Sequence, residues 1–226
     1  MKRLRILTVL FDTDIKPAEL SAFRDSIAKK AGPENPLLSN FNSDEQISFG
    51  YPLIQYKTVQ NKPLILCIDN NLDSLQNFFK GHDWNLEIEG HKFPMKIDML
   101  QLHNLSLDVW EYAIDYEIKN WIALNNENYP KYTKLQTNPE RIEFLEDILK
   151  ANMLSFAKGI NWMIKKDIGI KITYINDPRP ITFKGKTLLG FNLGFKTNVD
   201  LPNYIGLGKN VNLGFGIVSE RIKEKR

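Results

Sequence analysis

A glycine-rich segment near the C-terminus, residues 206–216, restricts the fold more than any other feature of the sequence. It holds four glycines in eleven residues, with Lys209 and Asn210 between them. Glycine reaches positive φ, and successive amides in such a turn form a nest that suits a phosphate. A dinucleotide-binding glycine motif or a P-loop would instead open a helix. Ten residues follow Gly216, and Asn210 rather than Ser or Thr follows Lys209, so we expect neither fold. A hairpin that merely turns a corner is the alternative.

The first part of the chain predicts the order strand, helix, strand, strand, helix, strand. Hydrophobic periodicity and turn residues carry this prediction. The expected elements are a strand over 4–11, a helix over 17–31, a hairpin of strands 47–56 and 64–68, a helix over 72–79, and extended chain over 84–88 and 93–102. This is the ferredoxin-like order.

The second part predicts a similar order, with the glycine-rich segment in place of the second helix. Residues 109–122 are a strand or a connection, and 125–132 are turn-like. Thr137 and Glu140 have capping-box spacing at the start of a long helix that ends at Gly159. Strands are expected over 168–175, in two runs over 181–199, and over 212–218. The predicted fold is therefore α+β, with two tandem ferredoxin-like (RRM-like) halves, 1–106 and 107–226, each with an antiparallel sheet.

Charge is distributed unevenly along the chain. Residues 1–150 contain 17 Lys and Arg against 22 Asp and Glu, whereas residues 151–226 contain 13 against 5. The C-terminal third is thus strongly basic, which indicates either a polyanion site or a solvated face with a basic tail.

Several kinds of site are not expected. One cysteine, Cys67, allows no internal disulfide or cysteine-based zinc cluster. The three histidines, His82, His91 and His103, have no metal-ligand spacing, so we predict no metal site and no cofactor. The apolar run near the N-terminus ends at Asp12, which favours a strand over a signal peptide, and no stretch has the length of a membrane span. We expect a cytoplasmic protein.

Three motifs together carry a family resemblance. Residues 51–57 read Tyr-Pro-Leu-Ile-Gln-Tyr-Lys, residues 154–159 read Leu-Ser-Phe-Ala-Lys-Gly, and residues 201–216 contain the glycine-rich segment. In this order they resemble the CRISPR repeat-RNA processing endoribonucleases of the repeat-associated mysterious protein (RAMP) superfamily, b-type subfamily. The resemblance implies two ferredoxin-like halves that bind CRISPR repeat RNA and cut it once per repeat. It implies a metal-independent cut in which the 2′-hydroxyl attacks the adjacent phosphate.

The resemblance also implies candidate site residues. Many members carry a His-x-His pair before the 51–57 motif, and the matching positions here are Asn40 and Asn42. Asparagine hydrogen-bonds a phosphate but carries no proton at neutral pH. Tyr51 would orient the 2′-hydroxyl or stack on a base, or else be a core aromatic. The candidate catalytic residues are Asn40, Asn42 and Tyr51; the candidate RNA-binding residues are Gly206, Gly208, Lys209, Asn210, Gly214, Gly216, Lys165, Lys166 and Arg179.

Three functions remain open at this stage. The first is a repeat endoribonuclease, with effector-complex proteins or a second copy of the chain as further partners. The second is a non-catalytic RNA-binding subunit of the same fold, which the missing histidine pair favours. The third is an unrelated ferredoxin-like enzyme or scaffold.

Overall fold

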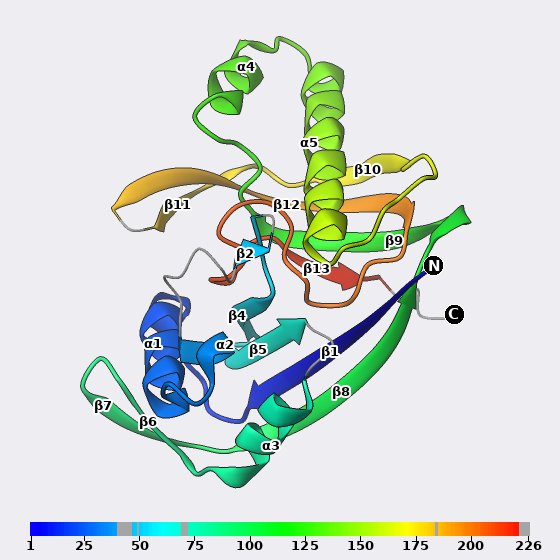
Figure 1. Ribbon diagram of the computed structural model, residues 1–226. Helices are drawn as coiled ribbons and strands as arrows, with labels where there is room; N and C mark the ends of the chain where they lie inside the picture. Colours follow the sequence, from blue (N-terminus) through cyan, green and yellow to red (C-terminus); the bar gives the residue numbers. More distant parts are fainter. Residues whose placement is uncertain (40–46, 49, 69–71, 184, 222–226) are drawn as a thin grey trace, which may run out of the picture.

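The computed structural model describes residues 1–39, 47, 48, 50–68, 72–183 and 185–221 (Figure 1). Its first sheet has the antiparallel strand order β4 (Ile54–Val59), β5 (Lys62–Ile68), β1 (Lys2–Phe11), β8 (Ile97–Leu107). If only the four strands of this sheet are numbered along the chain, the sheet has the order 2-3-1-4. This is the ferredoxin-like arrangement that the sequence predicts.

The helices of the first half lie on one face of this sheet. They are α1 (Leu20–Ala31), preceded by the 3-10 turn η1 (Pro17–Glu19), and α3 (Asp73–Gly81) (Figure 1). The strand predicted over residues 84–88 forms as β6 (Trp84–Ile88), but among the described strands its partner is β7 (His91–Met95), in a separate hairpin beside α1. The fourth strand of the sheet is β8 instead.

The single strand predicted over residues 47–56 was wrong. The chain forms two short strands, β2 (Ile47–Ser48) and β3 (Tyr51–Pro52), before β4 begins at Ile54. Gly50 between them has φ +83°, a conformation that ends an extended run. A short helix, α2 (Pro36–Ser39), precedes this region.

The second sheet repeats the topology of the first. Its order is β10 (Ile170–Ile175), β12 (Lys186–Val199), β9 (Val109–Trp121), β13 (Ile217–Glu220), and β11 (Arg179–Phe183) forms a hairpin with β12. The helix α5 (Asn138–Gly159) lies across this sheet (Figure 1). The chain between β12 and β13 contains no helix, as predicted. The predicted strand over 212–218 was wrong, because Gly214 and Gly216 have φ of +83° and +63° and the strand begins only at Ile217.

Two local predictions for the second half had different outcomes. The turn-like segment 125–132 contains the start of a helix, α4 (Asn128–Lys134), so that prediction was wrong in part. The capping box of α5 is confirmed, since the Thr137 amide donates to the Glu140 carboxylate at 2.9 Å and the Glu140 amide to the Thr137 hydroxyl at 3.4 Å. No helix of the described residues is long and apolar enough to cross a membrane.

The first sheet is buried on both faces, because strand side chains alternate between them. On β1, Leu7 and Val9 pack under α1 and α3, while Leu4 and Ile6 join the core of the second half. The boundary between residues 106 and 107 stays a prediction; β8 ends at Leu107 and β9 begins at Val109.

Candidate functional site: the glycine-rich loop and its anchors

The three sequence motifs meet in space around Tyr51. Its hydroxyl donates to the Gly206 carbonyl at 2.9 Å and accepts from Gln55 Nε2, also at 2.9 Å. The Gln55 Oε1 accepts from the Gly206 amide at 2.9 Å. These three bonds form a closed ring that fastens the first glycine of the loop to the first half of the chain.

The end of α5 packs against the same tyrosine. The rings of Tyr51 and Phe156 lie 5.3 Å apart, edge to face. A Cβ atom on Gly159 would lie 2.5 Å from the Tyr51 Cβ, so only glycine fits at that position. The 154–159 motif therefore combines an aromatic contact with a close approach.

The catalytic assignment of Tyr51 is not supported by its position. Its side chain is 4% exposed, and burial raises the pKa of its hydroxyl well above the usual value. Both of its hydrogen bonds are to residues of the protein. The structure thus gives Tyr51 the core position that the sequence left as the alternative, with a role in placing the loop.

Lys57 is a site residue that the sequence reasoning missed. Gln55 and Lys57 are two residues apart on β4 and therefore point to the same side. The Lys57 side chain is 0% exposed, and its Nζ donates to the Val211 carbonyl in the loop at 3.4 Å. Burial lowers the pKa of this amine from 10.5 to about 7. Its only signal in the sequence was its place at the end of the 51–57 motif.

The base of the loop is fixed to the end of β9. The Lys209 amide donates to the Ile122 carbonyl at 3.2 Å, and the Gly216 amide to the Asn120 carbonyl at 3.0 Å. Gly208 has φ +97°, and a Cβ atom there would lie 2.7 Å from the Trp121 ring. The segment is therefore a packed loop, rather than a hairpin that turns a corner.

The turn that begins at Lys209 has one exposed side chain, and Asn210 beside it is half-buried. The Lys209 side chain is exposed, and Asn210 has φ +55°. The β11–β12 hairpin reaches this region, since the rings of Phe183 and Phe215 lie 5.1 Å apart, and Arg179 is exposed on the same hairpin.

Lys166 lies far from the loop. Its Nζ donates to the Val109 carbonyl at 2.7 Å and is 3.8 Å from Asp108. Val109 begins β9 and Ile122 follows its end, so these points are separated by roughly 40 Å of strand. Lys165 is exposed on the same segment as Lys166. The structure does not bring these two lysines together with Lys209.

The histidines lie on elements other than those that anchor the loop. His82 follows α3, His91 lies on β7 and His103 on β8. The loop contacts β4, at the opposite edge of the sheet from β8, which is about 14 Å across three strand spacings. Asn40 and Asn42 lie outside the described residues.

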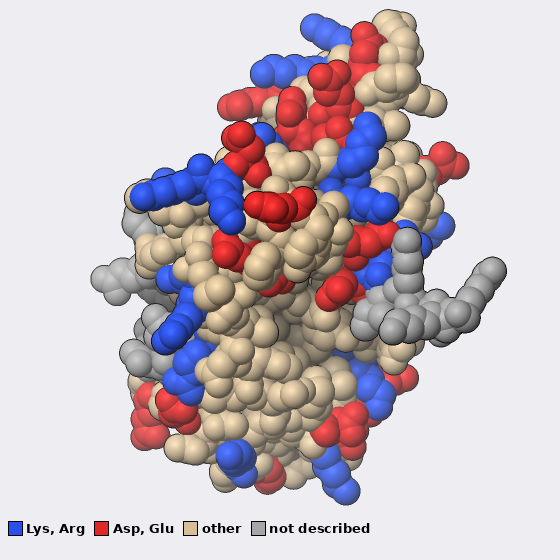
Figure 2. Space-filling view, turned by 90° about the vertical axis from the view of Figure 1, so that its right-hand side faces the viewer, with Lys and Arg blue, Asp and Glu red and all other residues tan. Residues whose placement is uncertain are grey.

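The basic excess does not form one patch on the face shown in Figure 2. Figure 2 shows Lys and Arg mixed with Asp and Glu over the upper part of that face. Several basic residues of the second half are paired with acids, including Lys119 with Glu117 at 2.9 Å and Arg221 with Asp115 at 3.6 Å. Charge alone therefore does not locate a nucleic-acid site on this face.

Comparison with known protein families divides the chain into the same two halves. Residues 2–106 match the Cas6b N-terminal domain, and residues 108–221 match the Cas6b C-terminal domain. The chain belongs to the Cas6b family. In this chain, the motifs that meet at Tyr51 come from both matched regions: residues 51–57 lie in the first, and residues 154–159 and 201–216 lie in the second.

Individual relatives extend the comparison. An uncharacterized protein of Methanocaldococcus jannaschii is 36% identical over 111 residues, which are 49% of this chain and 74% of the relative. A crystal structure of Cas6b is 26% identical with a TM-score of 0.83, over 97% of this chain and 100% of the other. The crystal structure of a CRISPR RNA processing endoribonuclease, also a Cas6b, is 25% identical with a TM-score of 0.67 over the same shares.

Proposed function

We propose that this chain binds the repeat sequences of precursor CRISPR RNA and cleaves them by metal-independent attack of a 2′-hydroxyl. Its family and its similarity to a CRISPR RNA processing endoribonuclease support the RNA substrate. The observation that carries the site is the loop itself. Buried anchors from the first half hold its backbone, while Lys209 at its tip stays exposed.

The reaction divides into tasks that can be assigned to residues. The 2′-oxygen forms a bond to phosphorus as the bond to the 5′-oxygen breaks, which leaves a 2′,3′-cyclic phosphate and a 5′-hydroxyl. The proton lost by the 2′-hydroxyl goes to a base, and the 5′-oxygen gains one from an acid. Lys209 and the amides of residues 210–212 would stabilise the charge that develops on the phosphate. Asn40 and Asn42 would hydrogen-bond that phosphate.

A second function, RNA binding without cleavage, is favoured by one observation. Among the described residues, the histidines lie away from the loop and the Tyr51 hydroxyl is buried under it. In the described part of the chain, Lys57 is the group at the loop whose pKa, about 7, suits proton transfer, but its side chain is fully buried. The loop and its anchors suit both functions.

Incubation with the cognate repeat RNA in excess EDTA tests the proposal. We expect one cut per repeat, a cyclic phosphate at the 3′ end of the upstream product, and no cut when the nucleotide before the scissile phosphate is 2′-deoxy. Binding without any cut would favour the second function. Cleavage that requires Mg²⁺, or that survives the 2′-deoxy substitution, would refute the mechanism.

A further inference from the structure

The strand orders of the two larger sheets end at β4, β8, β10 and β13, and in the described residues all of these end strands except β8 are bonded on their outer side to another segment of the chain. The loop covers the edges formed by β4 and β13, and α5 covers that formed by β10. The covering bonds are those from the Tyr56 amide to Asn212 O at 3.0 Å, the Val218 amide to Ile205 O at 2.9 Å, and the Ile172 amide to Glu146 Oε1 at 2.7 Å. Within the described ranges, β8 pairs with β1 alone, so its outer edge has no strand partner.

The β8 edge has one device that protects edge strands, a register shift in its pairing with β1 between Leu10 and Phe11, but it carries few others. Natural edges are short, or carry Lys, Pro or inward-pointing charges. β8 has eleven residues, IDMLQLHNLSL, and Asp98 is its single charged residue. It is about 36 Å long at roughly 3.3 Å per residue. The lower part of the face in Figure 2, where the first half lies, shows a broad area without charged side chains.

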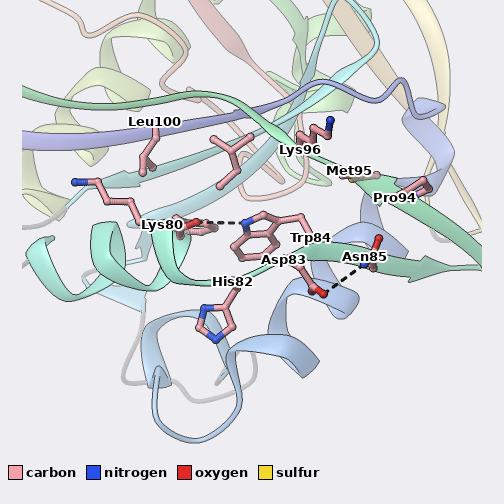
Figure 3. Close-up of a pocket in the computed structure, with 11 residues that line it drawn as sticks. Lys80, His82, Asp83, Trp84, Asn85, Pro94, Met95, Lys96 and Leu100 are labelled. Carbon is pink, nitrogen blue, oxygen red and sulfur yellow. Dashed lines mark hydrogen bonds between the residues drawn. The ribbon is translucent and has the colours of Figure 1, made fainter.

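A groove opens beside the first part of this strand. It has a volume of about 550 Å³ and lies between the end of α3, the β6–β7 hairpin and β8. Its apolar wall includes Trp84, stacked on Phe79 at 5.2 Å, together with Met95 and Leu100 (Figure 3). A groove between a helix and an unpaired edge strand is the arrangement in which domains bind an extended peptide as an added strand.

The charged side chains that line the groove are mainly lysines, although the Asp12 carboxylate accepts from the Lys96 amide at 2.7 Å and lies near the Lys96 charge. Lys80 and Lys96 line it on opposite sides (Figure 3). The acid at its rim, Asp83, is already bonded to Lys30 at 2.8 Å and to Asn85 at 3.3 Å. The rim therefore favours an acidic group on whatever binds there.

We propose that the β8 edge and this groove bind an extended segment of a partner protein as an added strand. An apolar side chain of that segment would enter the groove beside Leu100, and an acidic residue would lie near Lys80. Single-stranded RNA suits the site less well, because base stacking needs exposed aromatic faces and Trp84 and Phe79 are 4% and 1% exposed. The site lies at the opposite edge of the sheet from the glycine-rich loop, so both can be occupied together.

The test uses a defined peptide and the full chain. The probe is a fluorescein-labelled peptide of eight residues, alternating valine and threonine, with two aspartates at its C-terminus. Its matched control carries N-methyl groups on alternate backbone nitrogens, which removes the donors of an added strand. We expect saturable binding of the probe and at least about tenfold weaker binding of the control, since two or more hydrogen bonds are lost. Amide NMR shifts should concentrate on β8.

Two variants locate the binding. Lys80→Glu should weaken binding of the probe about fivefold, because it reverses a charge at the groove. Lys150→Glu, at an exposed position on α5, should leave probe binding unchanged. Both variants should cleave repeat RNA at the wild-type rate. A loss of peptide binding without a loss of RNA cleavage distinguishes the peptide site from the proposed RNA site.

Four outcomes would overturn the peptide site. They are no saturable binding at millimolar probe, equal binding of the methylated control, displacement of the probe by repeat RNA, and a wild-type dimer that Asn104→Pro converts to a monomer. The third would make the groove an RNA site, and the fourth would make its occupant a second copy of the chain.

Discussion

Replacement of Lys57 by methionine should make the protein more stable and its RNA binding weaker. The Lys57 side chain is fully buried and donates one long bond, 3.4 Å to Val211 O. Methionine has a similar length and no charge to desolvate. The substitution therefore removes the cost of a buried amine together with the contact that holds the middle of the loop.

The size of the stability change follows from the pKa. The pKa of Lys57 falls from 10.5 in the unfolded chain to about 7 in the folded protein, which corresponds to about 5 kcal/mol at 1.36 kcal/mol per pH unit. Between pH 7 and 10.5 the unfolded chain binds a proton that the folded protein lacks, so the free energy of unfolding rises with pH. Below pH 7 both states are protonated, and the full cost is present. Allowing about 1 kcal/mol for the lost bond, Lys57→Met should be about 4 kcal/mol more stable at pH 6.

Urea unfolding at pH 6, 7, 8 and 9, followed by circular dichroism, measures this effect. The stability of the wild type should rise by up to about 1.4 kcal/mol per pH unit above pH 7 relative to Lys57→Met. Lys150→Met, at an exposed position on α5, is the control and should follow the wild type. Parallel pH profiles for the wild type and Lys57→Met would refute the assignment of a buried, neutralised amine. An unchanged affinity for repeat RNA would refute its role in placing the loop.

Three further predictions concern the loop and the candidate catalytic positions. Lys209→Ala should weaken binding of repeat RNA and lower the salt slope of binding by about one unit, as measured by fluorescence anisotropy at several salt concentrations; an unchanged slope would exclude a phosphate contact. Gly208→Ala should weaken RNA binding and destabilise the fold by more than Gly90→Ala, because both have positive φ but only Gly208 faces the Trp121 ring; equal melting temperatures would show that the close approach is unimportant. Asn40→His and Asn42→His should each raise the single-turnover cleavage rate at least about tenfold with little change in affinity, since general acid–base catalysis contributes roughly 10²–10⁴-fold. An unchanged cleavage rate would show that these positions are not catalytic.

Some features of the protein depended on local interactions and could be predicted from the sequence. The capping box at Thr137 and Glu140 needs residues three apart, and it forms as predicted. The hairpin turn between β4 and β5 forms as predicted, and Asn61 in it tolerates its positive φ of 66°. Where a single residue interrupted a regular pattern, as at Gly50, the predicted strand was too long.

The topology was predictable for a related reason. Each half repeats an order of elements whose hydrophobic faces can be buried in few ways. The order therefore indicated two ferredoxin-like halves, and the motifs indicated the family. The hairpin β6–β7 was misplaced because its alternating pattern, Trp84, Leu86, Ile88, is the same whether a strand joins the main sheet or packs separately.

The sequence by itself determined most of the elements, their order in each half, and the family. The tertiary structure decided which polar residues serve the loop. Tyr51 and Gln55 reach Gly206 across 155 and 151 positions of the chain, and burial at that contact turns a candidate catalytic tyrosine into an anchor. The same folding buries Lys57 under Val211 and leaves Lys166 at the far end of β9 from the loop. Burial and distance between such residues arise only when the two halves pack, and no local pattern encodes them.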